Sequence, residues 1–366
     1  MNHPLYVDIA QAPYRALIGV GGIGAGSFFA LKGNHTLGRE ESRLGHFLPR
    51  RDYCKLHIIC HYVQTLLGPL FATIPIGKVG EDEMGVRLLH EMREAGLDTR
   101  YVQVAPSLQT LFSFCFIYPD GSGGNLTTDD SACAHVDAAY VRTAEPEFIR
   151  FAGCGIALAA PEVPLTARQA LLELGTRHRM LRVASFATGE LAEAIQLGML
   201  HHVDLLALNR SEAAAFAHLA AEEHTPAAIA HAAAERLRQL NPGARLTVTA
   251  GAQGSWSWDG HELVHRPAIP VTAISTAGAG DAFLAGILVG LVARLPLHQA
   301  HELGALVAAH AVTSPHTINK ETDRVALWQL AEALHVPLSQ AVRCLLASQD
   351  FASGSTLNTH EETDSR

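Results

Sequence analysis

The sequence predicts an α/β protein in which a mostly parallel central sheet is flanked by helices. Short apolar runs with strand character alternate along the chain with segments of helical pattern. Polar residues follow two of these runs where each strand should end, and a glycine-rich turn leads directly into a long apolar helix. Alternation of this kind is typical of parallel sheets that carry helices on both faces. Such sheets place their ligands at the carboxyl ends of the strands.

The strands and helices are expected in a regular order along the chain. The expected strands are 15–20, 70–76, 155–160, 181–186, 203–209 and 245–250. The expected helices are 82–95, 165–179, 189–201, 211–221 and 226–240. The strand assignments rest on short apolar runs, and the helix assignments rest on longer segments of helical periodicity.

Residues 110–133 interrupt this alternation. The segments 110–118 and 124–133 have strand character, and the Pro-Asp-Gly-Ser-Gly sequence between them is typical of a hairpin turn. A hairpin inserted into an α/β chain is suited to cover a site as a lid. The alternative is an edge hairpin without a role in binding.

We assign residues 1–330 to one large domain that contains the hairpin. Residues 324–347 have a helical pattern, and 331–350 are therefore expected to form a helical extension. Residues 351–366 are polar and rich in Gly, Ser, Thr and Glu, which predicts a disordered tail.

Composition excludes several classes of protein. The chain has 366 residues, of which 48% are hydrophobic, and this content suffices for a large buried core. Its formal net charge of -9 provides no basic field for nucleic acid or an anionic membrane surface. No window approaches the length of apolar sequence that a membrane span needs. The six cysteines lack disulfide spacing and the N-terminus lacks a signal peptide pattern, so we expect a cytoplasmic protein.

The most informative motif is the glycine-rich turn at residues 275–281. Gly278 and Gly280 allow the backbone to approach a bound group, and a helix that starts here directs free N–H groups toward an anion. Asp281 would then lie within reach of an attacking hydroxyl and accept its proton. These features indicate phosphoryl transfer. The alternative is a glycine-rich helix start with an acidic residue in its first turn.

Two other motifs follow expected strands. Asn209 and Glu212 are suited to phosphate and magnesium, because magnesium prefers oxygen ligands and keeps much of its water. They are equally suited to cap the next helix. Glycines in the segment 249–254 open space for a flat or charged ligand near the backbone, although this signal is weak by itself.

Two motifs favour other classes of protein. Residues 19–24 match the glycine spacing of a dinucleotide-binding turn. A Gly-Asn pair would cut the following helix short, and no second strand ends in an acidic residue at the expected distance, so we interpret the segment as a tight turn. Cys54, His57, Cys60 and His61 are close enough in sequence for a metal site, but their apolar surroundings favour a buried helix.

Taken together, the motifs resemble the ribokinase-like (PfkB) carbohydrate kinase family. Segments 209–212, 249–254 and 275–288 occur in the family's order and spacing, and 77–85 with 96–99 is similar to its N-terminal half. The resemblance implies a three-layer α/β fold with a small β lid through which homodimers often form. It also implies ATP and Mg²⁺ as cofactors and a small sugar or sugar-like molecule as acceptor.

The resemblance also implies roles for individual residues. Asp281 would be the catalytic base, and Gly278, Ala279 and Gly280 would form the anion hole. Asn209 and Glu212 would serve magnesium and phosphate positioning, with Glu212 reaching the metal through water. The residues expected beside the nucleotide are Thr249, Gly251 and Gly254.

Departures from the family pattern concern the acceptor side. Gly26 stands where the family has an Asp that holds sugar hydroxyls, and Cys54, Lys55 and Ile59 replace a Gly-Gly pair and an Asn. The identity of the acceptor is therefore open. A nucleoside kinase of the same fold and a non-catalytic regulatory protein that binds nucleotide or sugar are the alternatives.

The segment 38–55 is rich in basic residues. They are Arg39, Arg43, Arg50, Arg51 and Lys55. One hypothesis is that Arg39, Arg43 and Lys55 belong to the substrate site and that some of these cations contact an anionic acceptor, since guanidinium groups match such anions in bidentate geometry. The alternative is a solvated charged face.

Overall fold

The computed structural model describes residues 2–120 and 122–347. Its central layer is one sheet of nine strands in the order β14-β13-β12-β11-β10-β9-β1-β5-β6. The strands are β1 (Ala16–Val20), β5 (Ala72–Gly80), β6 (Val102–Ala105), β9 (Gly155–Ala159), β10 (Leu181–Ser185), β11 (Leu205–Asn209), β12 (Arg245–Thr249), β13 (Ser255–Trp258) and β14 (Leu263–Arg266). The pairs from β6 to β12 are parallel, and β13 and β14 add an antiparallel edge. The predicted mostly parallel sheet is thus confirmed.

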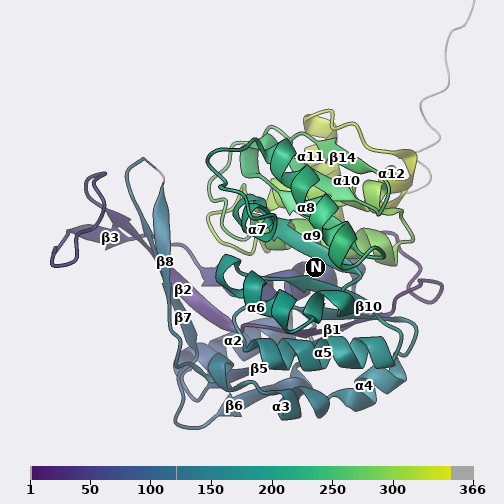
Figure 1. The fold of residues 1–366 in the computed structure, drawn as a ribbon, viewed down its shortest axis with the longest axis horizontal. Helices are drawn as coiled ribbons and strands as arrows, with labels where there is room; N and C mark the ends of the chain where they lie inside the picture. The colour runs from purple at the N-terminus through teal and green to yellow at the C-terminus, as the bar shows by residue number, and fades with distance from the viewer. Residues whose placement is uncertain (1, 121, 348–366) are drawn as a thin grey trace, which may run out of the picture.

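Helices cover both faces of this sheet (Figure 1). One face carries α1 (Lys55–Leu67), α2 (Glu83–Glu94), α9 (Ala279–Val292), α10 (Leu297–Ala311), α11 (Arg324–Ala333) and α12 (Gln340–Leu346). The other carries α3 (Ala138–Arg142), α4 (Glu145–Arg150), α5 (Leu165–Arg177), α6 (Leu191–Gln196), α7 (Arg210–Phe216) and α8 (Pro226–Leu240). Along β1 the side chain of Leu17 enters the first core and that of Ile18 enters the second, as the two-residue period of a strand requires.

The long apolar helix expected after the glycine-rich turn is α9. Its side chains from Ala282 onward are buried, because the helix packs against both α1 and α10. Gly286 permits close contact between the two helices, since a Cβ there would lie 2.7 Å from the Cα of Gly304. The contact holds the start of α9 in a fixed position relative to the core.

The lid is larger than the predicted hairpin. It contains β2 (Gly24–Leu31), β3 (Gly45–Phe47), β4 (Asp52–Tyr53), β7 (Leu111–Ile117) and β8 (Gly123–Thr127). The hairpin of β7 and β8 is confirmed, although its second strand ends at Thr127 instead of extending to Cys133, where a short 3-10 turn follows. The chain enters the lid directly after β1, because β2 pairs in parallel with β7. The lid projects to one side of the three layers in Figure 1.

Three further expectations concern the remaining segments. The chain continues from residues 19–24 into strand β2 and not into a helix, which agrees with the tight turn and excludes the dinucleotide-binding geometry there. The segment around Cys54 forms the buried helix α1, as expected. Helix α12 packs Val342 and Leu346 into the same core as α9. The predicted tail at 351–366 lies outside the described residues.

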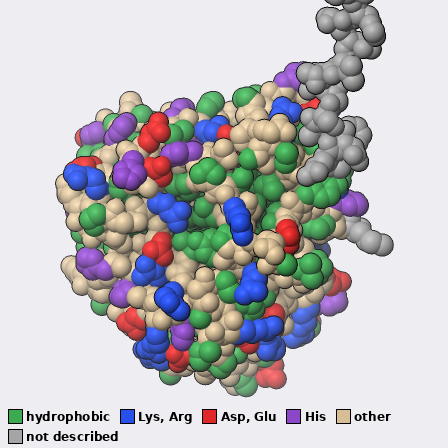
Figure 2. Space-filling view, turned by 90° about the vertical axis from the view of Figure 1, so that its right-hand side faces the viewer, with side chains coloured by type: hydrophobic (Ala, Val, Ile, Leu, Met, Phe, Trp, Pro, Cys, Tyr) green, Lys and Arg blue, Asp and Glu red, His purple; other side chains and the backbone are tan. Residues whose placement is uncertain are grey.

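In the two described ranges, no helix has the combination of length and apolar character that a membrane crossing requires. On the face shown in Figure 2, basic and acidic side chains are interspersed and do not form one broad basic field. This distribution agrees with the acidic net charge of the whole chain, -9.

Candidate active site

The start of α9 forms the centre of the candidate site. Gly278 precedes the helix with φ 77°, a left-handed conformation that glycine adopts without strain. A Cβ at this position would lie 2.6 Å from the backbone oxygen of Thr317, so a larger residue has no room. The N–H of Ala279 donates to the carbonyl of Thr276 at 3.3 Å. Within the described residues, the N–H groups of Gly280 and Asp281 have no such backbone partner, and they are free to bind an anion.

Asp281 forms an ion pair with Lys55. The residues lie in the first turns of α9 and α1, and the Nζ of Lys55 lies 3.9 Å from Oδ1 of Asp281. Burial raises the pKa of Asp281, while the positive charge of Lys55 opposes this rise. The charge of Asp281 in turn raises the pKa of Lys55, and the carboxylates of Glu212 and Glu162 add to this effect. The four side chains thus form one electrostatic cluster.

Glu162 follows β9 and was not identified from the sequence. Its backbone has φ 76°, which is unusual for a residue with a side chain and costs about 1–2 kcal/mol. Its Oε2 accepts the backbone N–H of Lys55 at 3.2 Å. Burial raises the pKa of Glu162 to about 7, against the opposing charge of Lys55. Strained residues of this kind cluster at functional sites.

The glycine-rich turn at residues 19–24 makes room for Glu162. A Cβ on Gly22 would collide with the carboxylate of Glu162, and the N–H of Gly22 donates to the carbonyl of Pro161 at 2.9 Å. The glycine spacing that resembled a dinucleotide-binding turn therefore has a steric explanation. It allows two strand ends, those of β1 and β9, to approach closely.

Asn209 and Glu212 cap helix α7. Oδ1 of Asn209 accepts the N–H of Glu212 at 2.9 Å, and the carboxylate of Glu212 accepts the N–H of Asn209 at 2.8 Å. The two residues therefore do form the helix cap that the sequence allowed as an alternative role. Burial raises the pKa of Glu212, while Lys55 lowers it and Asp281 adds to the rise. Glu212 thus caps its helix and also contributes charge to the site.

The predicted nucleotide residues lie at and after the end of β12, and Thr249 is close to the first turn of α9. Oγ1 of Thr249, at the end of β12, lies 3.7 Å from the position that a Cβ of Gly280 would occupy. Gly251 has φ 56° with open space around it, and Gly254 has φ 87°. A Cβ on Gly254 would collide with the backbone of Arg266. Gly251 and Gly254 therefore add no side chains of their own to this strand end.

The structure places Asp52 beside Gly26. The two residues pair across strands β4 and β2, and a Cβ on Gly26 would lie 2.7 Å from Oδ2 of Asp52. Burial raises the pKa of Asp52, and the charge of Asp281 adds to this rise. A carboxylate from β4 thus occupies the space beside the position where the family pattern expects one on β2. No local sequence signal marks Asp52, because the pairing of β4 with β2 is a tertiary feature.

The predicted acceptor-side residues separate into two groups. Lys55 belongs to the cluster around Asp281. Arg39 is exposed on the segment between β2 and β3, and the guanidinium of Arg43 pairs with Glu41 at 2.6 Å on the same segment. Contact of Arg39 and Arg43 with a substrate stays a prediction. Ile59 packs in the core, and Ile58 is the residue whose Cδ1 lies 3.3 Å from the Cβ position of Gly278.

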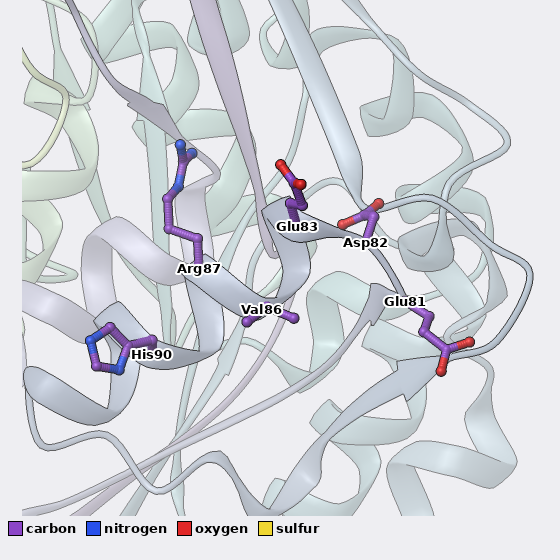
Figure 3. A pocket seen from close by; sticks show the side chains of 6 residues that line it. All are labelled: Glu81, Asp82, Glu83, Val86, Arg87 and His90. Carbon is purple, nitrogen blue, oxygen red and sulfur yellow. The ribbon is translucent and has the colours of Figure 1, made fainter.

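A hollow of about 690 Å³ at the start of α2 is separate from these residues. Figure 3 shows its side chains, which come from α2 and from the two residues before it. Asp82 is occupied there as the N-cap of α2, since it accepts the N–H groups of Gly85 and Thr110. No residue of the Asp281 cluster lines the hollow.

The carboxylates of the site suit a magnesium ion that is bound together with nucleotide phosphates. No group of three or more His, Cys, Asp or Glu side chains in the described residues is arranged to hold a metal ion by itself. Magnesium commonly keeps several waters and binds through one or two carboxylates together with substrate phosphates. Glu212, in the carboxylate cluster beside the free N–H groups of α9, is suited to that mode.

Three features together define a ribokinase-like phosphotransferase. They are the mostly parallel sheet, the β lid and the buried carboxylate at a helix start that is preceded by glycine. The sequence model of the pfkB family of carbohydrate kinases matches this chain over residues 61–324. It belongs to that family and is a carbohydrate kinase, as the sequence motifs predicted.

Individual proteins that are similar to this chain are kinases as well. Ribokinase of Schizosaccharomyces pombe is 25% identical over 240 residues, 65% of this chain and 72% of the relative. Arabidopsis thaliana ribokinase, complexed with ribose and ATP, superimposes with a TM-score of 0.66 at 19% identity and covers 87% of this chain and 99% of its own. Burkholderia thailandensis nucleoside kinase, in complex with inosine, gives a TM-score of 0.66 at 17% identity, with 87% and 97% covered. The two structures establish the fold.

Proposed function

We propose that this carbohydrate kinase transfers the γ-phosphoryl group of ATP to a hydroxyl of a small sugar or sugar-like acceptor. The observation that carries the proposal is the position of Asp281. Its carboxylate lies in the first turn of α9, beside free N–H groups and 3.9 Å from Lys55. A base for the hydroxyl and donors for the transferring group thus meet at one helix start.

Asp281 acts as the general base. Burial raises the pKa of its carboxyl group, which strengthens it as a proton acceptor, while Lys55 keeps it ionised. The acceptor hydroxyl gives its proton to Asp281 as its oxygen attacks the γ-phosphorus of ATP, and the bond from that phosphorus to the bridging oxygen breaks so that ADP leaves. The N–H groups of Gly280 and Asp281 and the adjoining backbone of Gly278 and Ala279 hold the charge of the phosphoryl oxygens. Most of the rate enhancement then comes from positioning and electrostatics.

Thr249, Gly251 and Gly254 leave space for the nucleotide beside the first turn of α9. Support for ATP comes from the Arabidopsis ribokinase, which is complexed with ATP. Mg²⁺, when bound, neutralises phosphate charge. Glu212 would hold it through water, and Asn209 fixes the orientation of Glu212 by the reciprocal hydrogen bonds of the helix cap.

Asp52, Lys55 and Glu162 form the acceptor side of the site. Two carboxylates and an ammonium group suit an acceptor with several hydroxyls, because each hydroxyl both donates and accepts hydrogen bonds. Gly26 lacks a side chain and leaves the space to Asp52. The nucleoside kinase in complex with inosine has the same fold, so a nucleoside is the second acceptor class to test.

The lid is the proposed dimer contact. Its apolar side chains include Leu44, Phe47 and Leu126, which are more than half exposed. Burial of such side chains against a second copy would be favourable. All six cysteines are free thiols, which supports the proposal of a reducing, cytoplasmic location.

The test is release of ADP from ATP and Mg²⁺ across a panel of neutral sugars, sugar phosphates, sugar acids and nucleosides. Release that depends on one acceptor class supports the proposal and names that class. ADP release that stays at the background rate with every acceptor, in a protein that binds ATP, would favour the non-catalytic alternative.

A further inference from the structure

The carboxylate of Asp52 lies on one face of the lid together with other polar side chains. Residues that pair directly across neighbouring strands share a face, and Asp52 on β4 pairs with Gly26 on β2, which pairs with Ser113 on β7. Cys115 lies two residues further along β7 and belongs to the same face. The charge of Asp281 raises the pKa of Asp52, so this face, the inner face, is the one near the catalytic base.

We propose that Asp52 selects an acceptor that carries an ammonium group, as an amino sugar does. The inference rests on the proposed function, because it concerns the acceptor of the same site. A neutral sugar places a hydroxyl at Asp52, whereas an amino sugar places a protonated amine there. The hydrogen bond from the amine to the carboxylate is charge-assisted and roughly twice as strong as the bond from a hydroxyl.

Buried carboxylates elsewhere in the molecule are paired with cations. Glu147 lies 3.2 Å from Arg100 and Glu302 lies 2.6 Å from Arg266, and each glutamate side chain is 8% exposed. Asp52 is also partly buried, but within residues 2–120 and 122–347 no Lys, Arg or His side chain forms an ion pair with it. Because an uncompensated charge is unfavourable away from water, a cation on the acceptor would stabilise this carboxylate.

The groups that contact Asp52 are neutral hydrogen-bond donors. The Sγ of Cys115 donates to Oδ2 of Asp52 at 3.5 Å, and a thiol is a weak donor. Burial raises the pKa of Asp52, while hydrogen bonds from Cys115, from the N–H of Tyr53 and from the hydroxyl of Thr317 lower it. Since these donors bring no positive charge, the carboxylate keeps its attraction for a cation.

The nearest cations in sequence are engaged by other carboxylates. Lys55 pairs with Asp281 at 3.9 Å. Arg51 precedes Asp52 directly, but its Nη1 donates to Glu91 at 3.2 Å. Alternate residues of an extended strand point to opposite faces, so Arg51 and Asp52 do not meet. Neither cation therefore neutralises Asp52.

The structure also gives little support to an anionic acceptor at this site. Arg43 was expected to contact such an acceptor, but its side chain is only 5% exposed. Its guanidinium donates to both carboxylate oxygens of Glu41 and to the carbonyls of His35 and Thr36. These contacts occupy Arg43 within its own segment. A cationic acceptor is thus favoured over an acidic or phosphorylated sugar.

The rest of the inner face suits the hydroxyls of a sugar. Oγ of Ser113 and Oγ1 of Thr127 lie 3.3 Å apart on the paired strands β7 and β8. Hydroxyl groups both donate and accept hydrogen bonds, as sugar hydroxyls do. The face therefore presents one carboxylate for an amine and neutral groups for the remainder of an amino sugar.

The test is a calorimetric titration in the presence of ADP and Mg²⁺, which measures acceptor binding without turnover. Two sets of sugars are compared, each with a hydroxyl, an amine or an uncharged N-acetyl group at one position. The first set is glucose, glucosamine and N-acetylglucosamine, and the second is fructose, 1-amino-1-deoxyfructose and its N-acetyl derivative. In at least one set the wild type should bind the amino sugar about tenfold more tightly than the hydroxyl parent. The N-acetyl derivative should not share this gain.

Asp52→Asn should abolish the preference, because the amide still accepts a hydrogen bond but carries no charge. Asp52→Ser gives the same comparison if the amide variant fails to fold. Asp129→Asn, at an exposed position after β8, is the matched control and should keep the wild-type ratio. A merely structural role for Asp52 would weaken binding of both sugars equally. An unchanged ratio in the folded Asp52 variants would therefore overturn the proposal.

Amino sugars that bind the wild type no more tightly than their parents in both sets would overturn the proposal, and so would the absence of binding of either amino sugar. These results are distinct from a failure of the kinase proposal. Phosphorylation of neutral sugars without any preference for an amine would overturn the inference about Asp52 alone. A tenfold preference in binding, with ADP release from ATP at the background rate, would support that inference and count against the kinase proposal alone.

Discussion

The ammonium group of Lys55 lies 3.9 Å from the carboxylate of Asp281, and each residue lies in the first turn of a different helix. The pairing places a cation beside a partly buried base, at a point where helix N–H groups already favour negative charge. Mutations can separate the effect of this ion pair on the reaction rate from its effect on the pH dependence of activity.

Asp281→Asn should lower kcat by orders of magnitude and leave nucleotide affinity nearly unchanged. The amide keeps the size of the side chain but does not accept the proton of the acceptor hydroxyl. Steady-state kinetics with the identified acceptor, together with a direct nucleotide-binding titration, measure the two effects. Glu83→Gln, which changes an exposed first-turn carboxylate of α2, is the matched control. A kcat within twofold of the wild type would refute the role of Asp281.

Lys55→Met should move the acid limb of the pH profile of kcat/KM to higher pH. The positive charge of Lys55 lowers the pKa of Asp281, so its removal raises that pKa. Because the base must be ionised to accept a proton, activity is then lost at a higher pH as the solution is acidified. Lys55→Arg keeps the charge and should keep the limb near its original position. An identical limb in Lys55→Met and the wild type would contradict this assignment.

Glu162→Gln should flatten the pH dependence of stability between about pH 4.5 and pH 7. The folded-state pKa of Glu162 is about 7 and its ordinary value is 4.5. Because the folded protein binds the proton more tightly, the stability contributed by the protonated group is present below pH 4.5 and is lost as pH rises toward 7. The full effect is at most about 3 kcal/mol.

Thermal unfolding of wild type and Glu162→Gln across this pH range measures the difference. The advantage of the amide should grow as pH rises, since the amide carries no charge to bury. Glu223→Gln, at an exposed position, should follow the wild-type curve. Parallel wild-type and Glu162→Gln curves would show that the carboxylate keeps an ordinary pKa.

Asp52→Asn should raise the acceptor KM more than it lowers kcat. The side chain lies beside Gly26 on the acceptor side, where it is expected to bind a hydroxyl in both the ground state and the transition state. Initial rates over a range of acceptor concentrations separate the two parameters. Asp129→Asn, an exposed residue after β8, is the control. A fall in kcat with an unchanged KM would assign Asp52 to another role.

Much of the central fold was predictable because it depends on local pattern. The strand at 245–250 and the helix at 226–240 follow from apolar periodicity and agree with β12 and α8 within a residue. The start of α9 was recognisable for a similar reason, since the glycines and the acidic residue that shape it are contiguous. The lid was only partly predictable: its hairpin has a turn signature, whereas β2 and β4 gain their strand conformation from pairing with distant residues.

The sequence alone therefore determined the alternating α/β architecture, the family and the residues of contiguous motifs such as 275–281. Tertiary structure decided which residues from separate segments meet: Lys55 with Asp281, Asp52 with Gly26, and Glu162 with Gly22. The physical reason is the range of the interactions involved. Periodicity, turns and caps act over a few neighbouring residues, whereas strand register, close backbone contacts and the electrostatics of a buried cluster exist only after the whole chain has packed.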